Sequence, residues 1–184
     1  MQKKSDNNVY FDVCGTLFSV NTTFDFICYY HRYNRNYTYF LLCKLLQSFI
    51  GKVAHKLFGF SMRKVFFSTI RFEKKHDLEN VADLYCRTQL QGSKIDIVFD
   101  SFLDKLESNE YNVVLVSASI DPVINSLAEI YNVKCFSSML EYDFNEEFTG
   151  KLKFDLKGNK DQILLNSKGF DSAFYSDNND DVKL

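Results

Sequence analysis

The hydrophobic positions of the chain alternate between short continuous runs and runs with helical spacing. Continuous apolar runs occur at 9–11 and 111–116, and each leads directly into polar residues. Such runs are typical of strands buried on both faces of a sheet. Over 95–106, by contrast, apolar residues recur three and four positions apart, as in an amphipathic helix that packs one face on a sheet. This alternation predicts an α/β protein with a doubly wound parallel sheet.

A helical pattern fills the interval between the first strand and the next strand-like segment. Helices are expected at 22–30, 37–50 and 77–91, and Asp77 is the expected N-cap of the third. Residues 19–92 are therefore predicted to form a mostly helical block inserted after the first strand. The elements expected after 116 are a helix at 123–131, a strand at 133–138, a hairpin around 148–152, a helix at 160–169 and a strand from 173.

The expected helix at 37–50 is strongly apolar but contains Lys44 and Gln47. It is shorter than the ~20 residues that cross a bilayer, so it is not predicted to span a membrane. A buried or cap helix is favoured over a membrane-surface helix, because the polar face is thin rather than richly cationic. A basic neighbourhood follows, made up of Lys52, His55, Lys56, Arg63 and Lys64. Two interpretations are open, a solvated face and a platform for an anionic substrate or membrane.

Composition limits the size of the protein and the class of its partners. At 184 residues with 46% hydrophobic content, the chain can bury one core and a modest insertion. Its formal net charge of −2 gives no reason to expect a nucleic-acid partner. The five cysteines include no C-x-x-C pair, and the segment at 1–8 is polar, unlike a signal peptide. We therefore expect reduced thiols in a cytoplasmic protein.

The first strand ends in an aspartate. Asp12 follows the apolar run at 9–11, and Gly15 supplies a turn residue without a Cβ. This aspartate lies at the carboxyl end of a buried strand, where open α/β sheets bind their ligands. The sequence D-x-x-G-T-L resembles the first motif of the haloacid dehalogenase (HAD) superfamily, D-x-D-x-T-L/V. Asp12 and Thr16 match that motif, and Cys14 stands at its second aspartate.

The second strand leads into two serines. Ser117, Ala118 and Ser119 follow the run at 111–116, and an Asp-Pro pair then starts a helix at Asp121. Hydroxyl groups and backbone amides at the start of a helix form an anion site. The segment resembles the second motif of the phosphoserine phosphatase-like group of the HAD superfamily, whose first serine binds the phosphoryl group. Ordinary helix capping explains Asp121 equally well, but it explains the two serines less well.

Two further segments come in the order that this family requires. Lys160 stands at the start of an expected helix, as the lysine of the third motif does, and Lys157 is the alternative. Asp177 and Asp181 resemble the two aspartates of the fourth motif, with Ser176 in place of the usual glycine. An acidic solvated loop is the alternative interpretation of these carboxylates. Their position after three ordered matches favours a metal site.

The resemblance implies a Rossmann-like sheet with an inserted, mostly helical cap. The core would consist of residues 1–18 and 93–184, and the cap of residues 19–92. The resemblance also implies a Mg²⁺-dependent phosphatase whose substrate is a phosphorylated small molecule, a phosphomonoester. The cap would close over that substrate and set specificity. Candidate substrate contacts in the cap are Thr22, Thr23, His31 and Arg32.

The resemblance assigns roles to individual residues. Asp12 would attack the phosphorus and form an aspartyl-phosphate, which water then hydrolyses. Mg²⁺ would be held by the Asp12 carboxylate, the backbone carbonyl of Cys14 and the Asp177 carboxylate, with Asp181 orienting these ligands. Two of the substrate-binding residues would neutralise the phosphoryl oxygens, namely Ser117 and Lys160. The whole substrate-binding group is Thr16, Ser117, Ala118, Ser119 and Lys160.

Two features depart from the family pattern. The second aspartate of the first motif is a general acid and base, a role that contributes roughly 10²–10⁴ in rate. Cys14 is a poor substitute, because a thiol is a weaker acid than a carboxylic acid. The sequence also stops at Leu184, where family members continue into another strand and helix, and two interpretations are open, a shortened product and a truncated gene. Weak activity is therefore expected, and an alternative stays open: a catalytically degenerate HAD-fold protein that binds a phosphorylated ligand or a partner.

Overall fold

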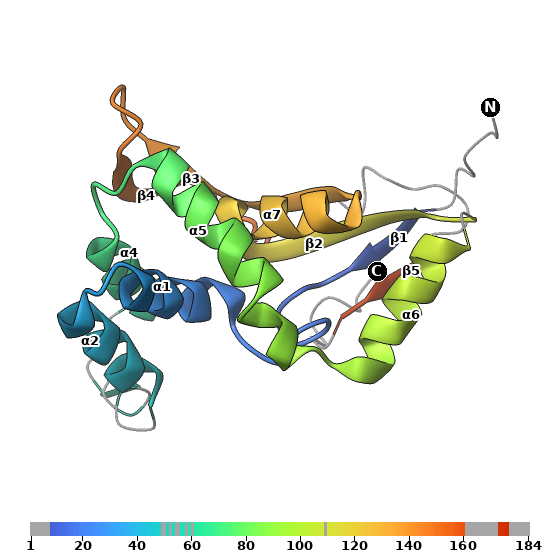
Figure 1. Cartoon of the computed structure of the whole chain (residues 1–184), viewed down its shortest axis with the longest axis horizontal. Coiled ribbons are helices and arrows are strands. Elements are labelled where there is room, and N and C mark those ends of the chain that lie inside the picture. Colours follow the sequence, from blue (N-terminus) through green and yellow to red (C-terminus); the bar gives the residue numbers. More distant parts are fainter. Residues whose placement is uncertain are drawn as a thin grey trace.

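The computed structural model describes residues 8–160, apart from 49–50, 52, 54–55, 58, 60 and 109, together with residues 173–176. Within these residues the strands form one sheet in the order β4-β3-β2-β1-β5 (Figure 1). The strands are β1 (Asn8–Phe11), β2 (Asn112–Ile120), β3 (Lys134–Tyr142), β4 (Phe148–Phe154) and β5 (Ala173–Tyr175). Every neighbouring pair is parallel except β3 and β4, which are antiparallel. The predicted α/β fold with a parallel sheet is therefore confirmed.

Helices fill most of the chain between β1 and β2. Those in the described residues are α1 (Thr22–Tyr33), α2 (Tyr37–Gln47), α4 (Met62–Thr69), α5 (Lys75–Arg87), the 3₁₀ turn η1 (Leu90–Ser93), α6 (Asp96–Glu107) and, after β2, α7 (Asp121–Tyr131). In Figure 1, α1, α2 and α4 lie together at one end of the molecule, and α6 lies near β5 at the other. Helix α5 packs along α7.

The core of the sheet is aromatic on the face that α6 and α7 cover. The Phe11 ring stacks on Tyr175 of the neighbouring strand with centroids 4.5 Å apart, and it meets Phe102 of α6 edge-on at 5.3 Å. Phe102 in turn contacts Tyr131 of α7 at 5.2 Å. Such edge-to-face pairs add to the stabilisation that comes from burial alone. They fix α6 and α7 against β1, whose carboxyl end carries Asp12.

One predicted helix has different bounds in the structure. The helix expected at 77–91 begins at Lys75 and ends at Arg87, and η1 follows it. The prediction of Asp77 as N-cap is wrong, because Lys74 occupies that position and Asp77 lies in the first turn. A carboxylate in the first turn still interacts favourably with the helix dipole. At the other end, the Thr88 hydroxyl donates to Leu84 O at 2.6 Å, where the helix stops.

The strands β2 and β3 are longer than predicted. β2 extends through Ile120, so that Ser117, Ala118 and Ser119 belong to its last residues. β3 extends through Tyr142 because it pairs with β4 in a hairpin. The helix expected at 160–169 lies outside the described residues apart from Lys160.

Backbone hydrogen bonds join the loop before α5 to the hairpin. Phe72 N donates to Phe148 O, and Phe148 N donates to Glu73 O, both at 2.9 Å. The Tyr30 hydroxyl of α1 also donates to the Glu73 carboxylate at 2.5 Å. These bonds connect the helices of the 19–92 segment to β4. The boundaries at 18/19 and 92/93 between core and cap stay a prediction.

Two predictions concern the environment of the chain. All five cysteines are free thiols, in agreement with the prediction. Among the described residues, no helix combines the length and apolar character that a membrane crossing needs.

Candidate active site

Asp12 is held in a tight turn directly after β1. Its backbone N–H donates to Tyr175 O at 2.9 Å, which extends the pairing with β5 by one residue. The residue is only 4% exposed, and its Oδ1 accepts a hydrogen bond from Val13 N at 2.7 Å. The turn that follows needs a φ of 80° at Gly15, a conformation that glycine adopts without a steric cost. The turn therefore holds the carboxylate at the carboxyl end of the sheet, as predicted for a ligand site.

Lys160 reaches Asp12 from far along the chain. Its Nζ lies 2.5 Å from Asp12 Oδ2, and the lysine is itself only 9% exposed. Two buried charges of opposite sign must be paired in this way to offset the cost of removing them from water. Lys157, the alternative, is exposed in the loop after β4. The structure thus places Lys160, not Lys157, beside the aspartate.

A cluster of four hydroxyls joins the end of β2 to the start of α1. We call it the hydroxyl cluster, and it consists of Thr22, Thr23, Ser117 and Ser119. Ser119 Oγ lies 2.6 Å from Thr22 Oγ1 and 2.7 Å from Thr23 Oγ1. Ser117 Oγ, on the fully buried Ser117, accepts from Ser119 N at 3.2 Å. Two of the predicted cap contacts, Thr22 and Thr23, are therefore placed at the second motif.

Cys14 connects the first motif to this cluster. Its Sγ lies 3.0 Å from Thr22 Oγ1 and 3.8 Å from Ser117 Oγ, and the residue is half-buried. The thiol therefore lies between the turn after Asp12 and the hydroxyls of motif two. Because thiols are weak hydrogen-bonding groups, this arrangement orients the side chain without anchoring it strongly.

The sequence did not single out Arg63, which contacts the site from α4. Its Nη2 donates to Ala118 O at 2.9 Å, and its Nη1 lies 2.7 and 2.8 Å from the two oxygens of Asp155. Ser138 Oγ donates to Ala118 O at 3.0 Å and to Asp155 Oδ1 at 3.2 Å. Burial works to raise the pKa of Asp155, but the Lys157 amide and the Arg63 guanidinium outweigh it and lower that pKa. In the sequence Arg63 was only one of several basic residues.

The other predicted site residues divide into two groups. Thr16 is buried in the loop after β1, whereas Asp177 and Asp181 lie outside the described residues. Among the described residues, no group of three acidic, His or Cys side chains could hold a metal ion.

Of the predicted cap contacts, His31 is buried against Thr69, and its Nε2 lies 2.9 Å from the Thr69 hydroxyl. Arg32 is exposed and donates to Gln89 at 3.0 Å, so these two hydrogen bonds involve neither Asp12 nor the hydroxyl cluster.

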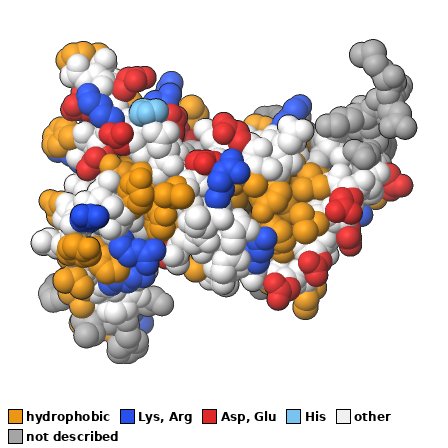
Figure 2. Space-filling view, viewed as in Figure 1, with side chains coloured by type: hydrophobic (Ala, Val, Ile, Leu, Met, Phe, Trp, Pro, Cys, Tyr) orange, Lys and Arg blue, Asp and Glu red, His pale blue; other side chains and the backbone are white. Residues whose placement is uncertain are grey.

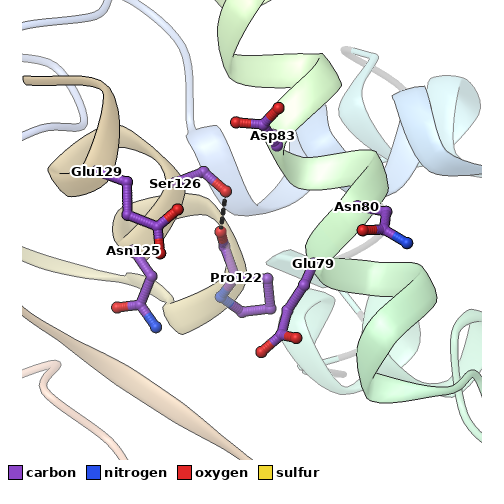
Figure 3. A pocket seen from close by; sticks show the side chains of 7 residues that line it. All are labelled: Glu79, Asn80, Asp83, Pro122, Asn125, Ser126 and Glu129. Carbon is purple, nitrogen blue, oxygen red and sulfur yellow. Dashed lines mark hydrogen bonds between the residues drawn. The ribbon is translucent and has the colours of Figure 1, made fainter.

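A polar cavity of about 400 Å³ lies between α5 and α7 (Figure 3). It is lined by Glu79, Asn80, Asp83, Pro122, Asn125, Ser126 and Glu129. None of the predicted site residues lines it. Its three carboxylates would repel a phosphoryl group, so the cavity is not suited to the anion that the hydroxyl cluster and Lys160 favour.

Fold and site together define an α/β protein with a buried aspartate–lysine pair and a cluster of hydroxyls at the carboxyl edge of its sheet. The sequence matches the family model of the haloacid dehalogenase-like hydrolases over residues 9–184. The chain therefore belongs to the haloacid dehalogenase-like hydrolase family. A sequence search of curated proteins found no match.

Solved structures share the fold at low sequence identity. A protein of unknown function from Bordetella pertussis Tohama I has a TM-score of 0.67 and 15% identity, over 92% of this chain and 81% of its own. A phosphoserine phosphohydrolase-like protein from Francisella tularensis subsp. tularensis SCHU S4 has a TM-score of 0.58 and 13% identity, over 91% and 76%. A phosphoserine phosphatase in its apo form has a TM-score of 0.56 and 16% identity, over 98% and 80%.

These comparisons bear on several predictions. The family match confirms the predicted HAD superfamily and the predicted enzyme class, a HAD-like hydrolase. The structural similarities confirm the predicted fold of the phosphoserine phosphatase-like group. The roles of the individual residues, the metal and the domain boundaries stay predictions.

Proposed function

We propose that this protein is a Mg²⁺-dependent phosphatase that hydrolyses a phosphorylated small molecule through an aspartyl-phosphate at Asp12. The observation that carries the proposal is the buried pair of Asp12 and Lys160, with Ser117 at the end of the neighbouring strand. A carboxylate nucleophile next to a cation and a hydroxyl suits an anionic, electrophilic phosphoryl group.

Asp12 acts as the nucleophile. One carboxylate oxygen attacks the phosphorus as the bond to the leaving oxygen breaks, and water later hydrolyses the acyl phosphate. The Val13 amide and the Lys160 ammonium orient the carboxylate in advance of this attack. Such pre-organisation reduces the entropic cost of reaching the reactive geometry.

Lys160 and Ser117 bind the phosphoryl oxygens. The Lys160 ammonium would contact these oxygens together with Asp12, and so stabilise the charge that they carry in the transition state. Ser117 Oγ accepts from Ser119 N, and its own proton can be donated to a phosphoryl oxygen. Thr16 and the backbone at Ala118 and Ser119 complete the predicted substrate-binding group.

The donor set around Asp12 fits a hard cation such as Mg²⁺. The Asp12 carboxylate and the Cys14 carbonyl, which belong to one short turn, supply the oxygen ligands that Mg²⁺ prefers. By their motif positions, Asp177 would supply a third oxygen and Asp181 would orient the ligands. When bound, Mg²⁺ would draw charge from the phosphoryl oxygens.

Cys14 limits the rate in this proposal. Its thiol contacts Thr22 and Ser117, in the position where the family motif has an acid and base. A thiol protonates a leaving alkoxide less readily than a carboxylic acid does, so esters with good leaving groups should be hydrolysed best. The same substitution favours a second candidate function, a degenerate protein that binds a phosphorylated ligand or a partner without useful turnover.

We further propose that residues 19–92 form a cap over a core of residues 1–18 and 93–184. Arg63 supports this division, because it contacts the proposed core at Ala118 O and Asp155. Apolar contacts also join the two parts, because the Phe67 ring of α4 meets Phe148 of β4 edge-on at 5.5 Å. The free thiols support a reducing compartment, the cytoplasm.

The test is hydrolysis of p-nitrophenyl phosphate with added Mg²⁺ and with a chelator. We expect metal-dependent release of nitrophenol that Asp12→Asn abolishes and Lys160→Gln lowers about 10²-fold or more. Lys157→Gln is the matched control, because this exposed lysine lies three residues away, and its activity should equal that of the unmodified protein.

A Cys14→Asp variant separates the two candidate functions. In a slow enzyme or a degenerate one, the restored carboxylic acid should raise the rate by up to roughly 10²–10⁴, and it should raise it most for esters with poor leaving groups. Hydrolysis by the unmodified protein supports the phosphatase, whereas hydrolysis by Cys14→Asp alone supports the degenerate protein. If neither folded protein hydrolyses the ester, the phosphatase proposal is overturned.

A further inference from the structure

The outer face of α2 carries an apolar stripe. Tyr37, Leu41 and Leu45 are 60%, 65% and 51% exposed, and their spacing of four residues aligns them along one side of the helix. Leu42 lies beside them and is also exposed. We call these four residues the α2 stripe. Single exposed leucines are common on protein surfaces, but an aligned group of this kind marks an interaction site.

The stripe is not required for packing within the chain. The inner face of α2 carries the buried residues Cys43 and Leu46, and it packs on α1. The side-chain amide of Asn36 caps the helix by accepting from Tyr39 N at 3.4 Å. Helix α2 is therefore anchored by its inner face and its cap, while the stripe faces solvent.

Basic residues lie close to the stripe. Lys44 lies on α2 next to it, and Arg32 and Arg35 are exposed at the end of α1 and in the loop between the two helices. Arg32 and Lys44 line one pocket together with Asp25, so one carboxylate lies close to these two cations. Figure 2 shows hydrophobic and basic side chains side by side over α2, at the lower left of the molecule. The wider segment 26–72 contains eight Lys or Arg and no Asp or Glu, although the whole chain has a net charge of −2. The charges of the protein are thus strongly segregated.

We propose that the α2 stripe docks on the surface of a lipid bilayer that contains anionic phospholipids. The leucines and the tyrosine would enter the boundary between headgroups and acyl chains, while Lys44, Arg32 and Arg35 contact the lipid phosphates. At 11 residues α2 is about 17 Å long, well short of the ~30 Å hydrocarbon layer, so it would lie in the interface.

The chemistry of the surface favours a bilayer over the other occupants. A second copy of the chain would bring two groups of Lys and Arg together with no acidic residue of 26–72 between them, and the charges would repel. Nucleic acid would be attracted by the charge, but aliphatic leucines do not provide the stacking that bases need. A bilayer with anionic headgroups offers both negative charge and an apolar interior, so it satisfies the arginines, the lysine and the leucines at once.

The experiment is flotation of the full chain with lipid vesicles. We expect the protein to float with vesicles of phosphatidylcholine mixed with phosphatidylglycerol, and much less with phosphatidylcholine alone. A Leu41→Gln, Leu45→Gln double variant should bind on the order of a hundredfold more weakly, from the lost apolar contact. Lys44→Glu should weaken binding at least fivefold, and more at low salt than at high salt.

The matched control is Ile97→Gln on α6, an apolar side chain that is even more exposed, at 84%, and lies far along the sequence from α2. This variant should bind vesicles like the unmodified protein. All substituted side chains are exposed, so circular dichroism and thermal melting should show unchanged folding; if the double variant does not fold, Lys44→Glu alone decides the test. The readout is binding, so it is independent of the proposed phosphatase activity.

Three outcomes would overturn the proposal. The first is absence of flotation with the mixed vesicles. The second is equal binding by the Ile97 and stripe variants. The third is self-association in analytical ultracentrifugation that the double variant abolishes while flotation is unaffected, which would assign the stripe to a second copy.

Discussion

Replacing Asp121 with asparagine is expected to stabilise the protein at neutral and alkaline pH and to have no effect in acid. Asp121 is the first residue of α7, and its Oδ1 accepts a hydrogen bond from Leu140 N at 3.0 Å. Burial, the largest cause, raises the pKa of its carboxyl from 3.8 to about 6. The folded protein therefore accommodates the neutral side chain better than the carboxylate.

The size and sign of the effect follow from this pKa. A change from 3.8 to about 6 corresponds to about 3 kcal/mol of unfolding free energy. Because the pKa is higher in the folded state, the associated stability is fully present below a pH of about 4 and is lost as the pH rises through about 6. Asparagine has the same shape, keeps the acceptor for Leu140 N and carries no charge. The Asp121→Asn variant should therefore gain about 3 kcal/mol of unfolding free energy at a pH of about 8 and none at a pH of about 4.

His31, which is also buried, changes the stability in the opposite direction over the same pH range. Burial lowers the pKa of His31 from 6.5 to about 4, so the stability that this residue contributes is lost as the pH falls from about 6.5 through about 4. In the unmodified protein the two groups partly cancel. The prediction therefore concerns the difference in unfolding free energy between Asp121→Asn and the unmodified protein. His31 contributes equally to both proteins, so its effect cancels in this difference.

The assay is urea unfolding followed by far-ultraviolet circular dichroism at pH values of about 4, 6 and 8. The control is Asp96→Asn, which changes the first residue of α6 in the same way. This control variant should lose at most about 1 kcal/mol of unfolding free energy, because the carboxylate no longer interacts with the helix dipole. An Asp121→Asn protein that is no more stable than the original at the highest pH would refute the reasoning. So would a stability difference that does not change with pH.

Two other substitutions test single contacts. Tyr142→Phe removes a buried hydroxyl that has no hydrogen-bond partner among the described residues, so the melting temperature should rise, by the equivalent of about 1 kcal/mol; a fall would show that the hydroxyl is satisfied in solution. Arg63→Lys loses the two-pronged contact with Asp155 and Ala118 O, so urea unfolding should show a loss of about 1 kcal/mol at neutral pH. Lys64→Gln, one position along α4, should change the stability by less than half of this, and equal losses would contradict the assigned contact.

The parts of the site that lie at strand ends could be predicted from the sequence. Asp12 and Ser117 each follow a continuous apolar run, and the carboxyl ends of parallel strands meet at one edge of a sheet. Lys160 was predicted from the order of the motifs, and the structure places it against Asp12. In these cases the local pattern and the sheet geometry agree.

Contacts between distant segments that no motif marks could not be predicted, because they leave no periodic pattern. Ser119 meets Thr22 across 97 positions, and Arg63 meets Asp155 across 92. The start of α5 was misplaced for a related reason. Asp77 has the better capping side chain, but Lys75 N donates to Glu146 O at 2.9 Å, and this tertiary contact fixes the chain before the helix begins.

Helix α1 connects the proposed active site around Asp12 with the α2 stripe. Its first residue, Thr22, touches Cys14, and its last residues lead into the α2 stripe. Twelve residues at 1.5 Å each give about 18 Å between these ends. On a docked protein, this length would be a large part of the separation between Asp12 and the headgroups. A phosphomonoester free in solution would reach it unhindered, whereas one carried by a lipid would have to rise out of the bilayer to meet it.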